Sequence, residues 1–168
     1  MTDIRMRAAA VRLVIFDVDG VFTDGRLVYT GEGEEVKVFH VRDGVGVKAL
    51  RGAGVEIAVI SGRKSDAVAL RMAELGIGRV YQGDHHKLPL FQELLADLGV
   101  TADQAAFVGD DLPDLPVLQQ VGLAACPADA HETVRQVCHW VGDRKGGDGA
   151  VREFCDFLMS CLPPAASS

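Results

Sequence analysis

Short runs of apolar residues recur along the chain and give the first sign of its fold. The clearest runs span residues 11–16, 55–60, 80–81, 105–108 and 123–125. They lack the regular apolar–polar alternation of a half-buried strand. Continuous runs of this kind are typical of parallel strands whose two faces are both covered by helices. The pattern therefore predicts five buried, parallel strands.

Between these runs, apolar residues recur at helical spacing. Val68, Met72 and Leu75 mark one helical face that ends at Gly76. A second helical face is marked by Phe91, Leu94, Leu95 and Leu98, and it ends at Gly99. Residues 101–104 read Thr-Ala-Asp-Gln, a capping-box pattern that predicts a brief helical turn before the fourth strand. A last helix is expected over residues 150–162, approximately.

The alternation of strands and helices defines the expected fold class. Right-handed crossovers between successive strands give an α/β fold, a three-layer doubly wound parallel sheet that binds ligands beyond the carboxyl ends of its strands. We expect one domain over residues 1–162. Residues 163–168 are small, polar and proline-containing, and they are expected to form a disordered tail.

The segment from residue 26 to residue 40 departs from this alternation. Apolar stretches at residues 27–29 and 36–39 flank the sequence Gly31-Glu-Gly-Glu34. Two short arms around glycines predict a β-hairpin. Because it follows the end of the first strand, we expect this hairpin, residues 24–40, to form a flap over the ligand-binding edge.

Composition narrows the kind of partner. The 168 residues carry a formal net charge of −7, which gives no electrostatic attraction to nucleic acid or to an anionic membrane. A small-molecule partner is therefore expected. The four cysteines show neither C-x-x-C pairing nor the spacing of a zinc site, so free thiols in a reducing compartment are expected. No apolar window approaches the length of a membrane span, and a cytoplasmic location is expected.

Polar residues follow four of the predicted strands. The first strand ends at Asp17 and Asp19, whose side chains would converge if the backbone stayed extended; ordinary turn acids are the alternative. The later strand ends contribute Ser61-Gly-Arg63, Lys87, and Asp110-Asp111 with Asp114. Each has an ordinary explanation alone, such as a helix cap or a solvated lysine. All of these residues are expected at the same edge of the sheet, and this shared position predicts a single site.

This set of groups suits hydrolysis of a phosphate ester through a phosphorylated carboxylate. Asp17 is the expected nucleophile, and Asp19 is expected to protonate the leaving oxygen and then to activate water. Ser61 and the backbone near Gly62 would hold phosphate oxygens, while Lys87 would offset their charge.

Acidic residues also predict a metal site. Asp17 and Asp110 offer the oxygen ligands that Mg²⁺ prefers. Asp114 is expected to act behind them or through water, and Asp111 stays unassigned.

The ordered residues resemble the four motifs of the haloacid dehalogenase superfamily, which has a Rossmann-like fold and an aspartate nucleophile. More narrowly, residues 11–162 are similar to the 3-deoxy-D-manno-octulosonate 8-phosphate phosphatase family. The supporting sequences are Asp17-Val-Asp-Gly-Val-Phe-Thr-Asp-Gly25, Val41-Arg-Asp-Gly44, Ser61-Gly-Arg63, Tyr81-Gln-Gly83, Gly109-Asp-Asp111 and Gly149-Ala-Val-Arg-Glu153. The resemblance implies Mg²⁺-dependent hydrolysis of this eight-carbon sugar acid phosphate, in lipopolysaccharide precursor synthesis, by a homotetramer.

The resemblance also implies residue roles. The metal would contact the side chains of Asp17 and Asp110 and the backbone carbonyl of Asp19. The implied substrate contacts are Asp19, His40, Val41, Arg42, Asp43, Gly44, Lys48, Arg63, Arg71 and Lys87. These cations suit a substrate that bears a carboxylate and a phosphate. The chain departs from the residues common in the family at His40, Lys48, Ser61 and Asp148. In similar enzymes the C-terminal segment reaches a neighbouring active site, and Arg152 is either part of such a contact or a solvated helix residue.

The spacing of the motifs leaves no room for a cap domain. Only the hairpin and one helix fit between Asp19 and Ser61, so a monomer would leave the site open to water. Pairing of flaps through apolar residues in a tetramer would supply the missing walls. These residues are Leu27, Val28, Tyr29, Val36, Val38 and Phe39.

Two alternative functions remain open, and the histidines carry a separate expectation. A phosphatase for a nine-carbon keto-sugar acid phosphate of the sialic acid type is the main alternative. A catalytically silent scaffold with the same fold is the other. His85, His86, His131 and His139 show no metal-ligand spacing, and surface or loop positions are expected for them.

Overall fold

A six-stranded parallel sheet forms the centre of the molecule, in the strand order β5-β4-β1-β6-β7-β8. The computed structural model describes residues 3–163, so the tail expected at residues 163–168 lies, apart from Pro163, outside the described residues. The strands are β1 Leu13–Phe16, β4 Glu56–Ser61, β5 Arg79–Gln82, β6 Ala105–Val108, β7 Leu123–Cys126 and β8 Trp140–Val141. The five predicted strands are confirmed. Strand β8 lies outside the prediction, because two residues carry too little pattern to identify a strand.

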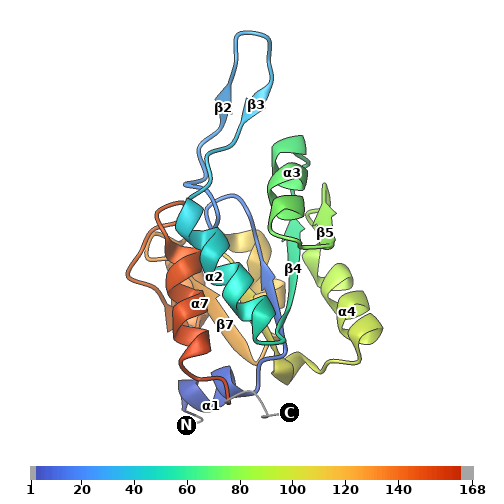
Figure 1. The fold of residues 1–168 in the computed structure, drawn as a ribbon, viewed down its shortest axis with the longest axis vertical. Coiled ribbons are helices and arrows are strands. Elements are labelled where there is room, and N and C mark those ends of the chain that lie inside the picture. The colour runs from blue at the N-terminus through green and yellow to red at the C-terminus, as the bar shows by residue number, and fades with distance from the viewer. Residues whose placement is uncertain (1–2, 164–168) are drawn as a thin grey trace.

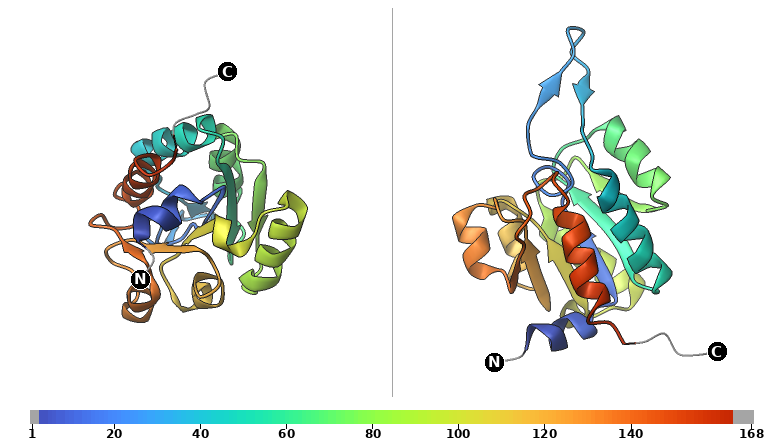
Figure 2. Two further views of the ribbon diagram at one scale, coloured as in Figure 1. Left: turned by 90° about the horizontal axis from the view of Figure 1, so that it is seen from below. Right: turned by 60° about the vertical axis from the view of Figure 1, so that its left-hand side comes forward.

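Helices cover both faces of the sheet and give the expected three layers (Figures 1 and 2). On one face, α2 (Val41–Gly52), α3 (Asp66–Glu74) and α7 (Ala150–Met159) pack over Val14 and Phe16 of β1. On the other face, α4 (Lys87–Leu98), α5 (Leu115–Leu118) and α6 (Glu132–Val137) pack over Leu13 and Ile15. Alternate residues of one strand thus serve two cores. The doubly wound fold class is confirmed.

The ends of several elements follow local chemistry. Gly99 ends α4 with a φ of 61°, in the left-handed region that favours glycine. The turn η1 (Ala102–Gln104) carries both hydrogen bonds of the expected capping box with Thr101. The short turn η2 (Leu112–Asp114) and helix α1 (Ile4–Ala9) complete the elements. Among the helices of residues 3–163, all are too short or too polar to cross a membrane.

The hairpin projects as a flap from the carboxyl end of the sheet (Figure 1). Its antiparallel strands are β2 (Val28–Tyr29) and β3 (Glu35–Val36), so the second arm is shorter than residues 36–39 suggested. Beyond β3 the chain returns to the body, where Phe39 packs against the core, while Val38 stays 72% exposed. Phe39 therefore has a cover within the chain, contrary to the expectation. Leu27, Val28, Tyr29 and Val36 are exposed, as expected.

Candidate active site

The carboxyl ends of the strands bring the predicted catalytic residues to one place. Asp17 directly follows β1, and its N–H donates to the carbonyl of Val108 over 2.9 Å. Asp110 follows β6, and Lys87 begins α4. These three side chains border a pocket of about 270 Å³, which Asp19, Gly62, Arg63 and His85 also line. Ser61, which ends β4, is buried directly before Gly62.

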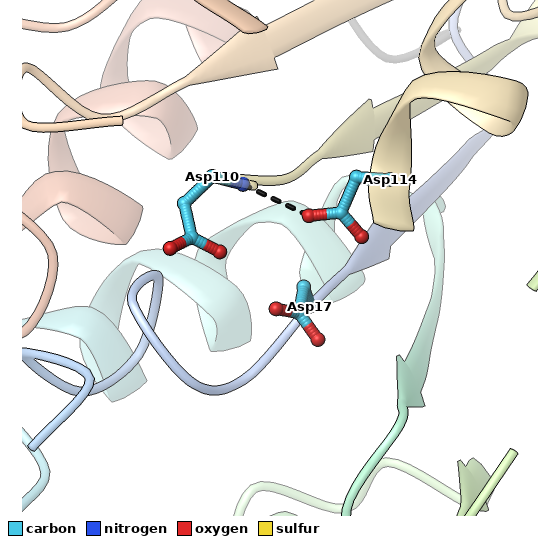
Figure 3. A group of neighbouring side chains, drawn as sticks. All are labelled: Asp17, Asp110 and Asp114. Atoms are coloured by element: carbon cyan, nitrogen blue, oxygen red, sulfur yellow. Dashed lines mark hydrogen bonds between the residues drawn. The ribbon is translucent and has the colours of Figure 1, made fainter. Parts of the chain in front are cut away.

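Three carboxylates crowd one wall of this pocket (Figure 3). Oxygens of Asp17, Asp110 and Asp114 lie within 4.8 Å of one another. Burial and the charge of Asp114 raise the pKa of Asp17 to about 6. Burial and the charges of Asp17 and Asp114 raise the pKa of Asp110 to about 8. Such repulsion between acids is what a bound cation relieves, and the all-oxygen donor set suits Mg²⁺.

The local backbone leaves space for this arrangement. Gly20 has a φ of 89°, and a Cβ built there would overlap the carboxylate of Asp110. A side chain at this position would therefore displace one of the acids. The residues present fit a magnesium ion held by Asp17 and Asp110.

Asp114 is committed to hydrogen bonds within the protein. Its Oδ1 accepts from Lys87 Nζ at 2.6 Å, and its Oδ2 accepts from the backbone N–H groups of Asp110 at 3.0 Å and Asp111 at 3.3 Å. Both oxygens are thus occupied, which suits the supporting role expected for Asp114. Asp111 is exposed, and its side chain accepts from the N–H of Leu112 at 2.8 Å. That contact makes Asp111 the cap of η2.

Lys87 is buried among these acids, with 4% of its side chain exposed. Its Nζ lies 2.8 Å from Asp17 Oδ1 and 2.6 Å from Asp114 Oδ1. Burial alone would lower the pKa of Lys87, but the two carboxylates outweigh burial and hold that pKa above its ordinary value. A permanent positive charge therefore lies beside the expected nucleophile.

Asp19 faces the flap rather than the acidic cluster. Because β1 ends at Phe16 and the chain turns at Gly20, the extended backbone that would align Asp19 with Asp17 does not continue. The Asp19 carboxylate instead forms an ion pair with Lys37, and Arg63 Nε lies 3.9 Å from its Oδ2. Asp17 and Asp19 still border the same pocket, with different partners.

Two residues at the site escaped the sequence interpretation. His85 is an exposed loop residue, as expected, yet it packs over the loop after β4: a Cβ on Gly62 would lie 2.5 Å from His85 Nδ1. Lys37 reaches Asp19 from the flap. The only sequence signal for His85 is its place two residues before Lys87. Lys37 offers no signal, because its partner lies 18 positions away.

The expected substrate contacts at the start of α2 lie apart from this pocket. His40 caps α2 by accepting from the N–H of Arg42 at 3.2 Å, and both residues line a separate hollow of about 520 Å³. Asp43 is buried, and burial raises its pKa to about 6. Val41 and Lys48 are exposed, and Gly44 is covered by the guanidinium of Arg71. Within one chain, the α2 residues therefore do not meet Asp17.

The beginning of α7 lines the same hollow and is tied to α2. The backbone N–H of Arg152 donates to Asp43 Oδ1 at 2.9 Å. The Arg152 side chain donates to Asp156 at 2.8 Å, an i,i+4 pair on the surface of α7. Asp148 and Arg152 both border the hollow. The four cysteines are free, in line with the expectation.

Known proteins are similar to this chain in sequence. A family model for haloacid dehalogenase-like hydrolases matches residues 40–122. The 3-deoxy-D-manno-octulosonate 8-phosphate phosphatase KdsC of Yersinia pestis is 46% identical over 157 residues, covering 94% of this chain and 84% of the relative. KdsC of Escherichia coli K12 is 45% identical with the same coverage.

Solved structures agree. The Yersinia pestis phosphatase superposes with a TM-score of 0.93 and 45% identity, covering 95% of this chain and 86% of that one. The Moraxella catarrhalis phosphatase, solved in complex with a magnesium ion, a phosphate ion and a KDO molecule, superposes with a TM-score of 0.94 and 38% identity, covering 96% and 93%. The chain belongs to the 3-deoxy-D-manno-octulosonate 8-phosphate phosphatase family of haloacid dehalogenase-like hydrolases.

Proposed function

We propose that this chain hydrolyses 3-deoxy-D-manno-octulosonate 8-phosphate to the free sugar acid and phosphate, with Mg²⁺ as cofactor, in lipopolysaccharide precursor synthesis. The observation that carries the proposal is the setting of Asp17, whose buried carboxylate lies between Lys87 and Asp110 at the end of β1. A buried acid beside a fixed cation and a metal-binding acid suits a carboxylate nucleophile for a phosphoryl group.

The acids and Lys87 divide the work of the first step. Asp17 and Asp110, with the backbone carbonyl of Asp19, would hold the magnesium ion, and the ion would supply positive charge that balances the phosphate against these acids. A carboxylate oxygen of Asp17 forms a bond to phosphorus as the bond from phosphorus to the sugar oxygen breaks. Lys87 and the loop of Ser61 and Gly62 hold the phosphoryl oxygens.

Asp19 handles the protons of both steps. In the first step its proton moves to the departing sugar oxygen, which leaves as an alcohol, and Asp19 becomes a carboxylate. In the second step this carboxylate accepts a proton from water as the water oxygen attacks phosphorus and the bond to Asp17 breaks. The products are phosphate and a regenerated Asp17.

We further propose that the enzyme is a cytoplasmic homotetramer. Free cysteines suit a reducing compartment. The exposed apolar residues of the flap offer a surface for pairing with other copies. An assembly would also explain why the expected contacts on α2, from His40 to Lys48, lie away from Asp17 of their own chain: they can face the pocket of a neighbour.

Turnover by variants tests the proposal. Asp17→Asn should abolish phosphate release from the sugar phosphate while circular dichroism and the mass of the assembly stay unchanged, because amide and carboxylate are similar in shape. Asp97→Asn, an exposed acid on α4, is the matched control and should keep full activity. Retained turnover in Asp17→Asn would exclude Asp17 as the nucleophile. Comparing eight- and nine-carbon sugar acid phosphates tests the substrate, and a preference for the nine-carbon ester would contradict it.

A further inference from the structure

The base of the flap carries a lysine, with a covered side chain, that the catalytic steps above do not use. Lys37 follows β3, and 2% of its side chain is exposed. Its Nζ pairs with Oδ1 of Asp19 and lies 2.9 Å from Oε1 of Glu35. A fixed positive charge on the flap therefore touches the expected proton donor.

A second cation completes the link between flap and body. Arg63, in the loop after β4, donates to Glu35 Oε2 at 2.5 Å and to the Tyr29 hydroxyl at 3.3 Å. Glu35 thus lies between Arg63 and Lys37. Arg63 holds the flap to the body through Glu35. The contact between Lys37 and Asp19 is therefore a second link between the flap and the body.

The contact selects one oxygen of the Asp19 carboxylate. Lys37 binds Oδ1, whereas Oδ2 is the oxygen nearer to Arg63, at 3.9 Å. That distance exceeds a hydrogen bond, so Oδ2 keeps its capacity to carry or accept a proton. When one oxygen of a carboxylate is held, its other oxygen points in a defined direction. Proton transfer in a transition state requires such an orientation.

We propose that Lys37 is a positioning residue that orients Asp19 for proton transfer to the leaving oxygen; this rests on the proposed function of Asp19. In the first step the Oδ2–H bond of Asp19 breaks and its proton passes to the sugar oxygen, as the bond from phosphorus to that oxygen breaks and the bond from Asp17 to phosphorus forms. The negative charge that appears on Asp19 then lies against Nζ of Lys37. The position of the flap and the orientation of the proton donor are thereby linked.

The test compares two esters that differ in their need for a proton. A sugar oxygen leaves poorly unless it is protonated, whereas nitrophenolate leaves readily as an anion. In the tetrameric, Mg²⁺-loaded enzyme, Lys37→Met should lower kcat/KM for the sugar phosphate by about ten- to hundredfold and for p-nitrophenyl phosphate by less than about threefold. This ratio reports the step in which the alcohol departs. Lys37→Arg should recover part of the lost activity, and Lys64→Met, an exposed lysine beside Arg63, should change neither value.

The Asp19→Asn variant separates a failure of the proposed role of Asp19 from a failure of the proposed role of Lys37. If Asp19→Asn lowers kcat/KM selectively for the sugar phosphate and Lys37→Met lowers kcat/KM equally for both esters, Lys37 only shapes the flap and the positioning role is wrong. If Asp19→Asn itself lowers kcat/KM equally for both esters, the proposed role of Asp19 as proton donor fails first; kcat is not compared, because the second step is common to both esters. An unchanged sugar phosphate rate in Lys37→Met also overturns the inference. Circular dichroism of each variant confirms that the fold is retained.

Discussion

Removing a metal ligand should make the metal-free protein more stable. Asp110 is held among other acids, and burial with the charges of Asp17 and Asp114 raises its pKa from 3.8 to about 8. The folded protein then binds this proton more tightly than the unfolded chain does, so metal-free stability falls as pH rises from about 4 to about 8. Asp110→Asn keeps the shape of the side chain and removes its charge.

The size of the effect follows from the shift in pKa. One pKa unit corresponds to about 1.4 kcal/mol, so the raised pKa of Asp110 opposes folding by several kcal/mol near pH 7.5, where the folded protein must hold a proton that the unfolded chain releases. Asp17 is subject to the same repulsion, and the two acids can hold one proton between them. The expected gain in the free energy of unfolding from Asp110→Asn is therefore reduced to about 2–4 kcal/mol. In a chain of this length that gain corresponds to a rise in Tm of about 5–15 °C.

Urea unfolding in the presence of a chelator measures this gain. Near pH 7.5 the Asp110→Asn variant should unfold at higher urea than the wild type, and the difference should shrink as pH falls to 4 and below, where Asp110 becomes protonated in both states. Added Mg²⁺ should stabilise the wild type but not the variant. Asp97→Asn should shift the free energy of unfolding by less than about 0.5 kcal/mol. A metal-free variant that is no more stable than wild type near pH 7.5 would refute the repulsion among these acids.

Two more expectations concern the pocket rim and the flap. Because His85 packs over Gly62, His85→Ala should weaken competitive inhibition by inorganic phosphate about fivefold, the equivalent of one hydrogen bond of about 1 kcal/mol. The control His86→Ala should leave this inhibition unchanged. Equal effects of the two variants would show that His85 is not part of the site. Val38 is 72% exposed on the flap, so Val38→Asp should shift the sedimentation coefficient from that of the proposed tetramer toward smaller species. Met6→Asp, at a residue that is 66% exposed on α1, should not shift it. An assembly of unchanged size in Val38→Asp would exclude the flap as the pairing surface.

Local patterns are sufficient for much of the fold. Residues 105–108 are apolar throughout and form β6 over that range, and the helix before Gly99 ends there because glycine adopts the left-handed conformation. The pattern fails where elements are short or atypical. Strand β8 has two residues, and α2 contains Gly44, Gly46 and Gly52, which carry no apolar periodicity.

The residues of the site likewise divide into those that the sequence predicts and those that it does not. Asp17, Lys87 and Asp110 follow strands and Ser61 ends one, so the rule for carboxyl ends of strands places them together. Lys37 and His85 come from a flap and a loop, whose direction depends on tertiary contacts. The separation of His40 and Arg42 from Asp17 is likewise a property of how α2 packs beside α7.

The central claim is that phosphate passes through a covalent bond to Asp17. Trapping the enzyme during turnover of the sugar phosphate with borohydride, which reduces an acyl phosphate to an alcohol, and then mapping peptides by mass spectrometry tests this claim directly. We expect the reduced residue at position 17 in wild type with Mg²⁺, and no trapped residue in Asp17→Asn. Full turnover with an unmodified Asp17, or trapping at a different acid, would contradict it.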